Sequence, residues 1–394
     1  MDSHRVRVFA HPSVRAALAA FIESRAPPSV SFDYADTGLC EHASLDAVSP
    51  GPPEAAAAEE GGSSAPPLAY FDVAEFGSAL ETETLGRTLL YAQTIDSTQT
   101  LLRDGLWGVD PSWGAICLAE SQVKGAGRGG NTWSSPPGCL LFSFHSQFNS
   151  GRSLPFVQYM ISLAVIQAIE GTTRAGGSGG GDARRLPIHI KWPNDIYADL
   201  GALGGAAAAA KDEAASSRDG AAASPEGSTS ASGSAGMVKI GGILCNSSSM
   251  MSGVFDVVTG VGFNVWNDEP TTSLRAIVDA ANDAAEPSSA APWRCPSSAA
   301  LVAAFLGHFE ALKTQFDRDG FSSFEDEYYA RWLHSGQSVV VEPHGRATIS
   351  GISHTTGALI AAASRPGGGD ETLELFPDGN SFDFMRGLVS KKKK

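Results

Sequence analysis

Short stretches of apolar residues, alternating or continuous, recur along the middle of the chain, and glycine, asparagine or proline bounds each of them. Runs of this length and composition are typical of β-strands. The pattern predicts strands over residues 88–92, 115–119, 139–144, 187–190, 238–248 and 254–266. After residue 338 the apolar runs become shorter and closely spaced, with Gly, His and Pro between them, which is typical of a small β-barrel or meander.

Helical periodicity separates these strands. It predicts helices over 97–106, 154–169, 299–316 and 321–333. Asp96, Ser97 and Thr98 stand where the first helix begins, and their side chains can cap it or bind a polar ligand beside its unpaired N–H groups. The alternation of strands and helices predicts an α+β fold with a mixed sheet, followed by a small C-terminal β-barrel.

Low-complexity segments divide the chain. Residues 1–66 begin with regular patterns and end in a Pro/Ala-rich linker, so we predict a small N-terminal accessory segment. A main domain is predicted over 67–334 and the small barrel, with a solvated lysine tail, over 335–394. Inserts near 171–185 and 200–235 are mostly Ala, Gly and Ser, so they are expected to be flexible and disordered, respectively.

Composition narrows the function. A net charge of −15 argues against general nucleic-acid binding. The sequence has no run of 18 apolar residues, the length that a membrane-spanning helix needs, so a membrane partner is not expected. The five cysteines show no CxxC spacing, which favours a reducing compartment. Cytoplasmic location is therefore expected. The arginine-rich start also suits a surface helix or a chloroplast or mitochondrial transit peptide.

The segment 120–144 is the strongest candidate for ligand binding. Glycines at 125, 127, 129 and 130 let backbone N–H groups approach a ligand closely, and Arg128 among them is a permanent cation suited to carboxylate or phosphate. The loop alone is equally consistent with an exposed hairpin rich in turn residues.

A second candidate is the sequence KWPNDIY, residues 191–197. Lys191 and Lys239 are notable because the chain has only nine lysines, four of them in the tail. Either could stabilise a phosphate or a developing negative charge, while Asn194 and Asp195 could hold a magnesium ion or the lysine itself. Trp192 could present a flat apolar face to a purine. Each residue alone is better explained as a salt bridge, turn cap or packed aromatic; their joint occurrence favours a site.

These motifs in this order, QVKGAGRGGNTWSSPPGCLLFS, KWPNDIY, KIGGIL and GVGFNV, resemble the catalytic domain of biotin–protein ligases, the holocarboxylase synthetases. LFPDGNSFDFMRGLV near the C-terminus resembles the plant and algal members, and the resemblance covers about 85–389 apart from the inserts. It implies a two-step reaction. Biotin and ATP, with Mg²⁺, give biotinyl-5′-adenylate and pyrophosphate. A lysine of a biotin carboxyl carrier domain of a biotin-dependent carboxylase then takes the biotinyl group and releases AMP.

The resemblance also implies roles for residues. The catalytic set would be Arg128, Lys191 and Lys239. Biotin would contact Ser97, Thr98, Gln99, Gln122, Gly125, Ala126, Gly127, Arg128, Lys239 and Gly242. ATP would contact Arg128, Asn131, Trp133, Lys191, Trp192, Asn194, Asp195 and Asn264, with Asp195 as the candidate metal ligand. Glycines 241, 242, 260 and 262 would permit close packing around the ligand.

The sequence differs from the family pattern at two positions, and two alternative functions remain open. Ala126 stands where the family commonly has Arg or Lys, so one cationic contact is missing, and Gln99 stands where Asn is frequent. No helix-turn-helix pattern precedes the catalytic motifs, so a repressor function is not expected. The rivals are a lipoate or octanoate ligase and a non-catalytic adenylate-binding regulator on the same fold.

Overall fold

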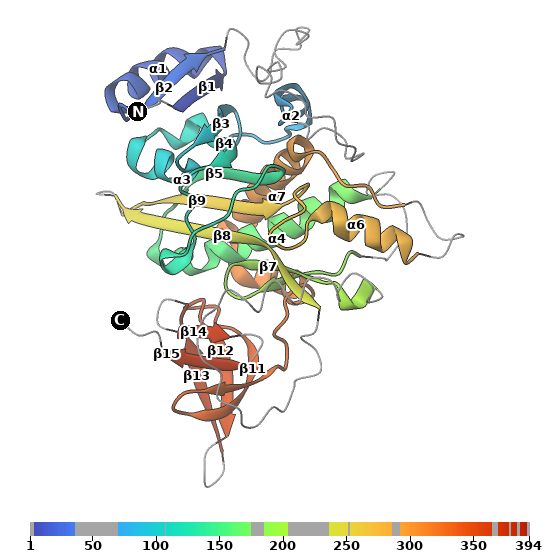
Figure 1. Ribbon diagram of the computed structural model, residues 1–394. Helices are drawn as coiled ribbons and strands as arrows, with labels where there is room; N and C mark the ends of the chain where they lie inside the picture. The colour runs from blue at the N-terminus through green and yellow to red at the C-terminus, as the bar shows by residue number, and fades with distance from the viewer. Residues whose placement is uncertain are drawn as a thin grey trace.

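The computed structural model describes residues 4–35, 70–106, 108–174, 185–203, 236–250, 253–285, 292–364, 369–377, 380–383 and 387–391. Within these ranges a nine-stranded mixed sheet with helices on both faces lies beside a curled six-stranded sheet formed by the C-terminal residues (Figure 1). The predicted α+β class is thereby confirmed. The linker and most of the two low-complexity inserts lie outside the described residues, so the expectations for them remain predictions.

The large sheet has the order β2-β1-β3-β4-β5-β9-β8-β7-β6. Six of its strands match the predicted hydrophobic runs, and several extend beyond them: β3 (Thr88–Ile95), β4 (Ala115–Gln122), β5 (Cys139–Phe148), β6 (Ile188–Lys191), β8 (Met237–Ser249) and β9 (Phe255–Asn264). A further strand, β7 (Asp195–Asp199), was not predicted. β3 and β4 run parallel, whereas β4, β5, β9, β8, β7 and β6 are successively antiparallel. β6 and β7 flank the KWPND turn, and β8 carries Lys239 beside them.

The N-terminal residues extend this sheet. β1 (His4–Ala10), α1 (Pro12–Arg25) and β2 (Val30–Tyr34) form a βαβ unit with parallel strands, and β1 pairs antiparallel with β3. Val6 and Val8 of β1 and Leu18 and Ile22 of α1 are buried in one cluster with residues of β3 and β4. The predicted boundary at 66/67 lies outside the described residues, while residues 4–35 contribute to the core of the main sheet.

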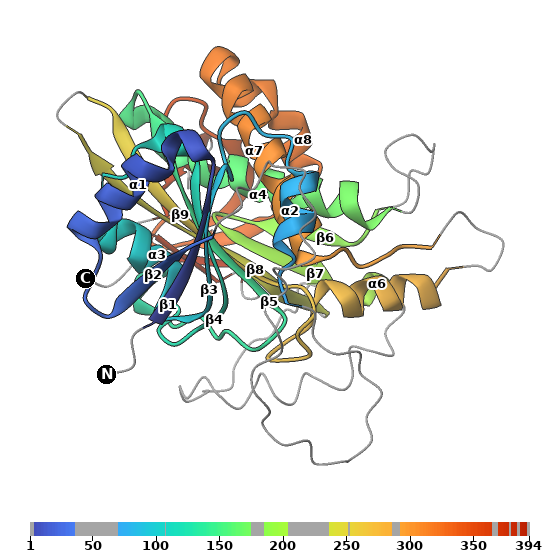
Figure 2. The same ribbon diagram turned by 90° about the horizontal axis from the view of Figure 1, so that it is seen from above.

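The two faces of the sheet carry different helices (Figure 2). α1 and the short α3 (Thr98–Thr100) cover one face. On the other face α2 (Val73–Ala79) and α7 (Ser298–Asp319) pack with α4 (Leu154–Thr173) over a large core. α4 is four residues longer than predicted. With its preceding turn it is long and apolar enough to cross a membrane, but 67% of that window is buried inside the molecule, as expected for a core helix.

Two predicted helices differ in form from the expectation, and one helix was not predicted. Residues 97–106 form the short α3 followed by a π-helical segment, Leu101–Gly105, and 321–333 form a 3₁₀ turn (Phe321–Ser323) and α8 (Glu325–Tyr329). The spacer after β9 contains an amphipathic helix that the sequence reading did not predict, α6 (Leu274–Asp283), capped by Ser273. Local propensity alone does not fix the type or the bounds of a helix, because tertiary context can override it.

The C-terminal sheet has the order β13-β12-β11-β10-β15-β14. Its strands are β10 (Ser338–Val341), β11 (Gly345–Ile352), β12 (Leu359–Ser364), β13 (Asp370–Leu375), β14 (Asn380–Asp383) and β15 (Leu388–Lys391). Its curled form agrees with the predicted small barrel. It contacts α4 closely: Tyr159 donates a hydrogen bond to the Gly357 carbonyl at 2.6 Å, and a Cβ on Gly357 would lie 2.5 Å from Pro155.

Candidate active site

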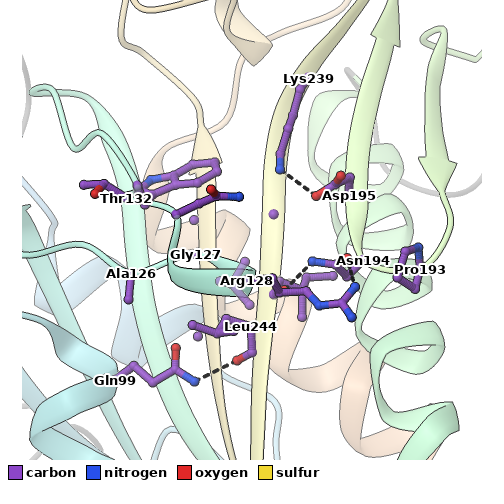
Figure 3. Close-up of a pocket in the computed structure, with 18 of the residues that line it drawn as sticks. Gln99, Ala126, Gly127, Arg128, Thr132, Pro193, Asn194, Asp195, Lys239 and Leu244 are labelled. Carbon is purple, nitrogen blue, oxygen red and sulfur yellow. Dashed lines mark hydrogen bonds and ion pairs between the residues drawn. The ribbon is translucent and has the colours of Figure 1, made fainter. Parts of the chain in front are cut away.

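A cavity of about 370 Å³ opens beside the large sheet. Its walls come from the start of α3, the end of β4 and the glycine loop after it, β5, the turn between β6 and β7, and the neighbouring strands β8 and β9. Two residues of the C-terminal sheet domain complete the lining. Figure 3 shows Gln99, Arg128, Asp195 and Lys239 around this cavity. This volume lies in the usual range for small-molecule sites. Segments that are distant in sequence therefore converge on one cavity.

One end of the cavity is polar and uncharged. The Thr98 backbone N–H and hydroxyl both donate to Gln122 Oε1, at 2.8 and 3.2 Å. The Thr98 hydroxyl also bonds Ser143 Oγ at 2.8 Å, and Ser97 Oγ caps α3 by accepting from the Thr100 N–H. Ser97, Thr98 and Ser143 are at most 3% exposed, so their hydroxyls lie in a largely dry environment. Fixed donors and acceptors of this kind suit an uncharged polar ligand group.

Gln99 lines the cavity and also ties its helix to the sheet. Its Nε2 donates to the carbonyls of Leu244 and Val258 and to Asn246 Oδ1, at 2.8, 3.2 and 2.9 Å. These bonds tie α3 to β8 and β9 beneath the cavity. Its Oε1 would lie 2.5 Å from a Cβ at position 260, which explains why glycine is needed there.

The glycine loop folds back on itself over the cavity. Gly127 N–H donates to the Asn131 carbonyl at 2.7 Å, and Trp133 N–H donates to the Gly125 carbonyl at 2.9 Å. The loop thereby delivers the Trp133 ring onto β8 and β9. A Cβ at Gly262 would lie 2.6 Å from this ring, so glycine permits the contact.

Arg128 links three parts of the site. Its Nη1 donates to Asn194 Oδ1 at 2.9 Å and its Nη2 to the Pro377 carbonyl at 3.3 Å. Asn194 in turn donates from Nδ2 to the Ile243 carbonyl of β8 at 2.7 Å. The guanidinium is therefore held between the loop, the KWPND turn and the C-terminal domain, with part of it facing the cavity (Figure 3).

The second cationic group is a triad. Asp195 Oδ1 accepts from Lys239 Nζ at 2.6 Å and Oδ2 accepts from Lys191 Nζ at 3.3 Å. Lys239 Nζ also lies 5.8 Å from the Trp133 ring centroid. Two ammonium groups on one carboxylate leave a net positive charge, so with Arg128 this end of the cavity is strongly cationic and suited to phosphate and carboxylate oxygens.

Metal binding by protein side chains alone is not favoured in the described residues. They contain no group of three or more His, Cys, Asp or Glu side chains able to hold an ion. Asp195 is the only carboxylate among the cavity-lining residues of this part of the chain, and lysines occupy both of its oxygens. A magnesium ion here would take its ligands mainly from nucleotide phosphates and water.

Most predicted site residues line the cavity. They are Ser97, Thr98, Gln99, Gln122, Ala126, Gly127, Arg128, Asn131, Trp133, Lys191, Trp192, Asn194, Asp195, Lys239 and Gly242. Gly125 and Asn264 do not. Asn264 is 4% exposed and donates to Thr271 Oγ1 and the Thr272 carbonyl, so it braces the turn after β9.

Trp192 reaches the cavity wall but offers no open face. It is 1% exposed, and its Nε1 donates to the Tyr159 hydroxyl at 2.8 Å, inside the core. The expectation that its ring presents a flat surface to a purine is therefore corrected: the ring anchors the turn from below.

Sequence reasoning missed several lining residues. They are Gly129, Thr132, Phe142, Ser143, Pro193, Ile243, Leu244, Val261, Pro377 and Phe382. Ser143 had a signal in the sequence, because it is a polar residue within the apolar run of β5, and its hydroxyl bonds that of Thr98. Pro377 and Phe382 lie in the LFPDGNSFDFMRGLV motif, which the sequence reading singled out without assigning it a place in the site.

The chain is similar to several known proteins. The model of the biotin/lipoate A/B protein ligase family matches residues 91–264. Biotin–protein ligase 2 of Arabidopsis thaliana is 34% identical over 331 residues, covering 82% of this chain and 82% of that protein. Biotin–protein ligase 1, chloroplastic, of the same plant is 32% identical, covering 82% of this chain and 74% of that protein. The solved biotin protein ligase from Aquifex aeolicus in complex with biotin and ATP is 19% identical, with a TM-score of 0.46 over 79% of this chain and all (100%) of that one.

Proposed function

Because this chain belongs to the biotin–protein ligases of the biotin/lipoate A/B protein ligase family, we propose that the cavity described above is where it joins biotin to ATP. The protein activates biotin to biotinyl-5′-AMP and then transfers the biotinyl group to a lysine of a biotin carboxyl carrier domain. The observation that supports this placement is the pairing of two unlike ends in one cavity, a dry uncharged polar end and a cationic end.

The polar end suits the ureido ring of biotin. That ring carries N–H donors and a carbonyl acceptor and no charge, which matches the hydroxyls of Thr98 and Ser143 and the amide of Gln122. Phe142, Leu244 and Val261 supply apolar walls between the two ends for an aliphatic chain. A polar ring-binding end of this kind favours biotin over lipoate or octanoate.

The cationic end suits the first step. A biotin carboxylate oxygen attacks the α-phosphorus of ATP, a phosphorus–oxygen bond forms, and the bond to the departing pyrophosphate breaks. Two anions must approach each other, so Arg128, Lys191 and Lys239 lower the barrier by offsetting their repulsion and by holding the reacting atoms in place. When bound with the nucleotide, magnesium would supply charge neutralisation of the phosphates; Asp195, the one carboxylate among the described lining residues, already pairs with two lysines.

The second step consumes the adenylate. The neutral amine of the acceptor lysine attacks the carbonyl carbon of the mixed anhydride, loses a proton, and AMP departs with the electrons of the carbon–oxygen bond. The adenylate is labile to water, and the glycine loop with Trp133 covers the cavity against β8 and β9. Ala126 leaves this cover with one cation fewer than the family pattern, so we propose weaker retention of the adenylate here.

The acceptors and the location are part of this proposal. Carrier domains of biotin-dependent carboxylases are the acceptors that biotin–protein ligases use, and we infer the same class for this chain. Cytoplasmic residence rests on cysteine usage alone, and fractionation of tagged protein among cytoplasm, chloroplast and mitochondrion would test it.

The decisive experiment is exchange of labelled pyrophosphate into ATP, with biotin, lipoate and octanoate in parallel. Exchange with biotin alone is expected. Exchange with lipoate or octanoate instead of biotin would show that the protein is a lipoate or octanoate ligase. Silence with all three, in a protein that still binds ATP, would favour the non-catalytic regulator.

A further inference from the structure

Trp192 is held from two sides within the KWPND turn. Its backbone N–H donates to His334 Nε2 at 2.9 Å, and its indole N–H donates to the Tyr159 hydroxyl at 2.8 Å. Trp192 and His334 are 1% and 0% exposed, so the backbone bond between them is shielded from water. A buried N–H without this partner would be costly.

Both hydrogen bonds lead to the C-terminal sheet. The Tyr159 hydroxyl donates onward to the Gly357 carbonyl, between β11 and β12. His334 Nδ1 lies 2.8 Å from Oε1 of Gln337, the residue before β10. Phe382 of β14 packs on His334, with ring centroids 5.0 Å apart. The turn is therefore fixed relative to the second sheet as well as to its own strands.

The ring of His334 is neutral. Burial lowers its pKa to about 4, the charge of Lys191 acts in the same direction, and the hydrogen bond to Gln337 opposes them. The partners assign the tautomer: Nδ1–H donates to the side-chain Oε1 of Gln337, which leaves Nε2 to accept from the Trp192 backbone N–H. His334 is thus set up as a hydrogen-bond acceptor for the turn.

The residues on either side of Trp192 face the cavity. Lys191 precedes it and bonds Asp195, and Pro193 follows it and leads to Asn194, which accepts from Arg128. A displacement of the Trp192 backbone would move both neighbours together. In a site that works by holding charges in place, a shift of about 1 Å costs roughly a hundredfold in rate.

We propose that His334, supported by Gln337, is a positioning residue for adenylate formation: it holds the Trp192 N–H and thereby sets Lys191 and Asn194 against the nucleotide. This inference rests on the proposed function of the cavity. It makes the C-terminal domain part of the first half-reaction through a contact that lies outside the cavity. The polar end, built from α3, β4 and β5, does not depend on it.

Three variants distinguish this positioning role from a general weakening of the contact with the C-terminal sheet. His334→Phe keeps a ring of similar size and removes the acceptor. His334→Gln restores an oxygen acceptor near the position of Nε2. Tyr329→Phe is the matched control, because it removes a different hydrogen bond to the C-terminal sheet, the one that the Tyr329 hydroxyl accepts from the Ile352 N–H at 2.7 Å.

Each full-length variant is measured in biotin-dependent pyrophosphate exchange and in amide hydrogen exchange of the peptide spanning 188–196. His334→Phe is expected to lose about tenfold or more in kcat/KM for ATP, the size of one buried hydrogen bond, with KM for biotin unchanged and faster amide exchange in the turn. His334→Gln should recover most of both, and Tyr329→Phe should match the unaltered protein.

The inference would be overturned if His334→Phe had the same ATP kinetics and the same amide protection of the turn as the unaltered protein. It would also be overturned if Tyr329→Phe lost as much activity as His334→Phe. If the unaltered protein gave no biotin-dependent exchange, the proposed function would fail on its own. The amide-exchange comparison needs no turnover, so it would still decide whether His334 holds the turn.

Discussion

Replacing Lys239 with alanine removes one of the cations at the reacting end of the cavity. In the structure its Nζ lies 2.6 Å from Asp195 Oδ1 and 5.8 Å from the Trp133 ring centroid. Asp195 would keep Lys191 at 3.3 Å as its ion-pair partner. The local charge would therefore fall by one where the biotin carboxylate and the α-phosphate must meet.

The expected cost follows from the exposure of the side chain. A charge-assisted hydrogen bond contributes about 1.5–3 kcal/mol. The Lys239 side chain is 40% exposed, so solvent screening places the loss near the lower end of that range. Adenylate formation should slow by roughly 10- to 30-fold in kcat/KM, which corresponds to about 1.4–2 kcal/mol.

Pyrophosphate exchange measures this loss, and two further variants decide its cause. If Lys239 acts only by neutralising Asp195, Asp195→Asn combined with Lys239→Ala should recover activity; if it contacts the reactants, the double variant stays slow, which is our expectation. Lys313→Ala is the matched control, because Lys313 also pairs at 2.6 Å, with Asp317, and lies 5.0 Å from the ring centroid of Phe148, away from the cavity. Wild-type exchange in Lys239→Ala would refute the site assignment.

Three further predictions use the same assays with stability measurements. Gly262→Ala would place a Cβ 2.6 Å from the Trp133 ring, so biotin and adenylate should be held about tenfold less tightly in equilibrium binding, whereas Gly307→Ala, with no atom within 4 Å, should bind normally. The pKa of His334 in the folded protein is about 4, below the usual value of 6.5. The contribution of His334 to the free energy of unfolding is therefore complete above pH 6.5 and declines as the pH falls towards 4, by at most about 1.4 kcal/mol per pH unit. Thermal melts of His334→Gln should lack this pH-dependent component. Replacing residues 204–235 by a short linker should leave pyrophosphate exchange nearly unchanged, because a backbone hydrogen bond of 2.9 Å from residue 200 to residue 236 joins the two sides of the insert. A large loss of exchange would show that the insert gates the site.

Much of the site was readable from local pattern. Glycine density and the cation Arg128 indicated a loop suited to an anionic ligand, and KWPND, directly after a predicted strand, indicated a second candidate segment. Such features are encoded within a few residues, because backbone sterics and side-chain chemistry act locally. Their order along the chain sufficed to identify the resemblance and to predict that they meet.

The direction in which individual side chains point was less predictable. Trp192 and Asn264 were both expected at the nucleotide, yet one anchors its turn on Tyr159 and the other braces the turn after β9. Hydrogen-bond partners for these side chains come from segments far away in sequence. A buried polar group takes whichever partner the fold supplies, and local pattern does not contain that information.

The sequence by itself determined the α+β class, the central strands, the two motif segments and the cationic character of the site. Only the tertiary structure decided that β1 pairs with β3, that α6 forms within the spacer, and that Pro377 and Phe382 reach the cavity. The reason is physical. Alternation with period two fixes which face of a strand is buried, but it does not specify the neighbouring strand or the remote domain that packs against it, because those contacts are selected by the global burial of apolar surface.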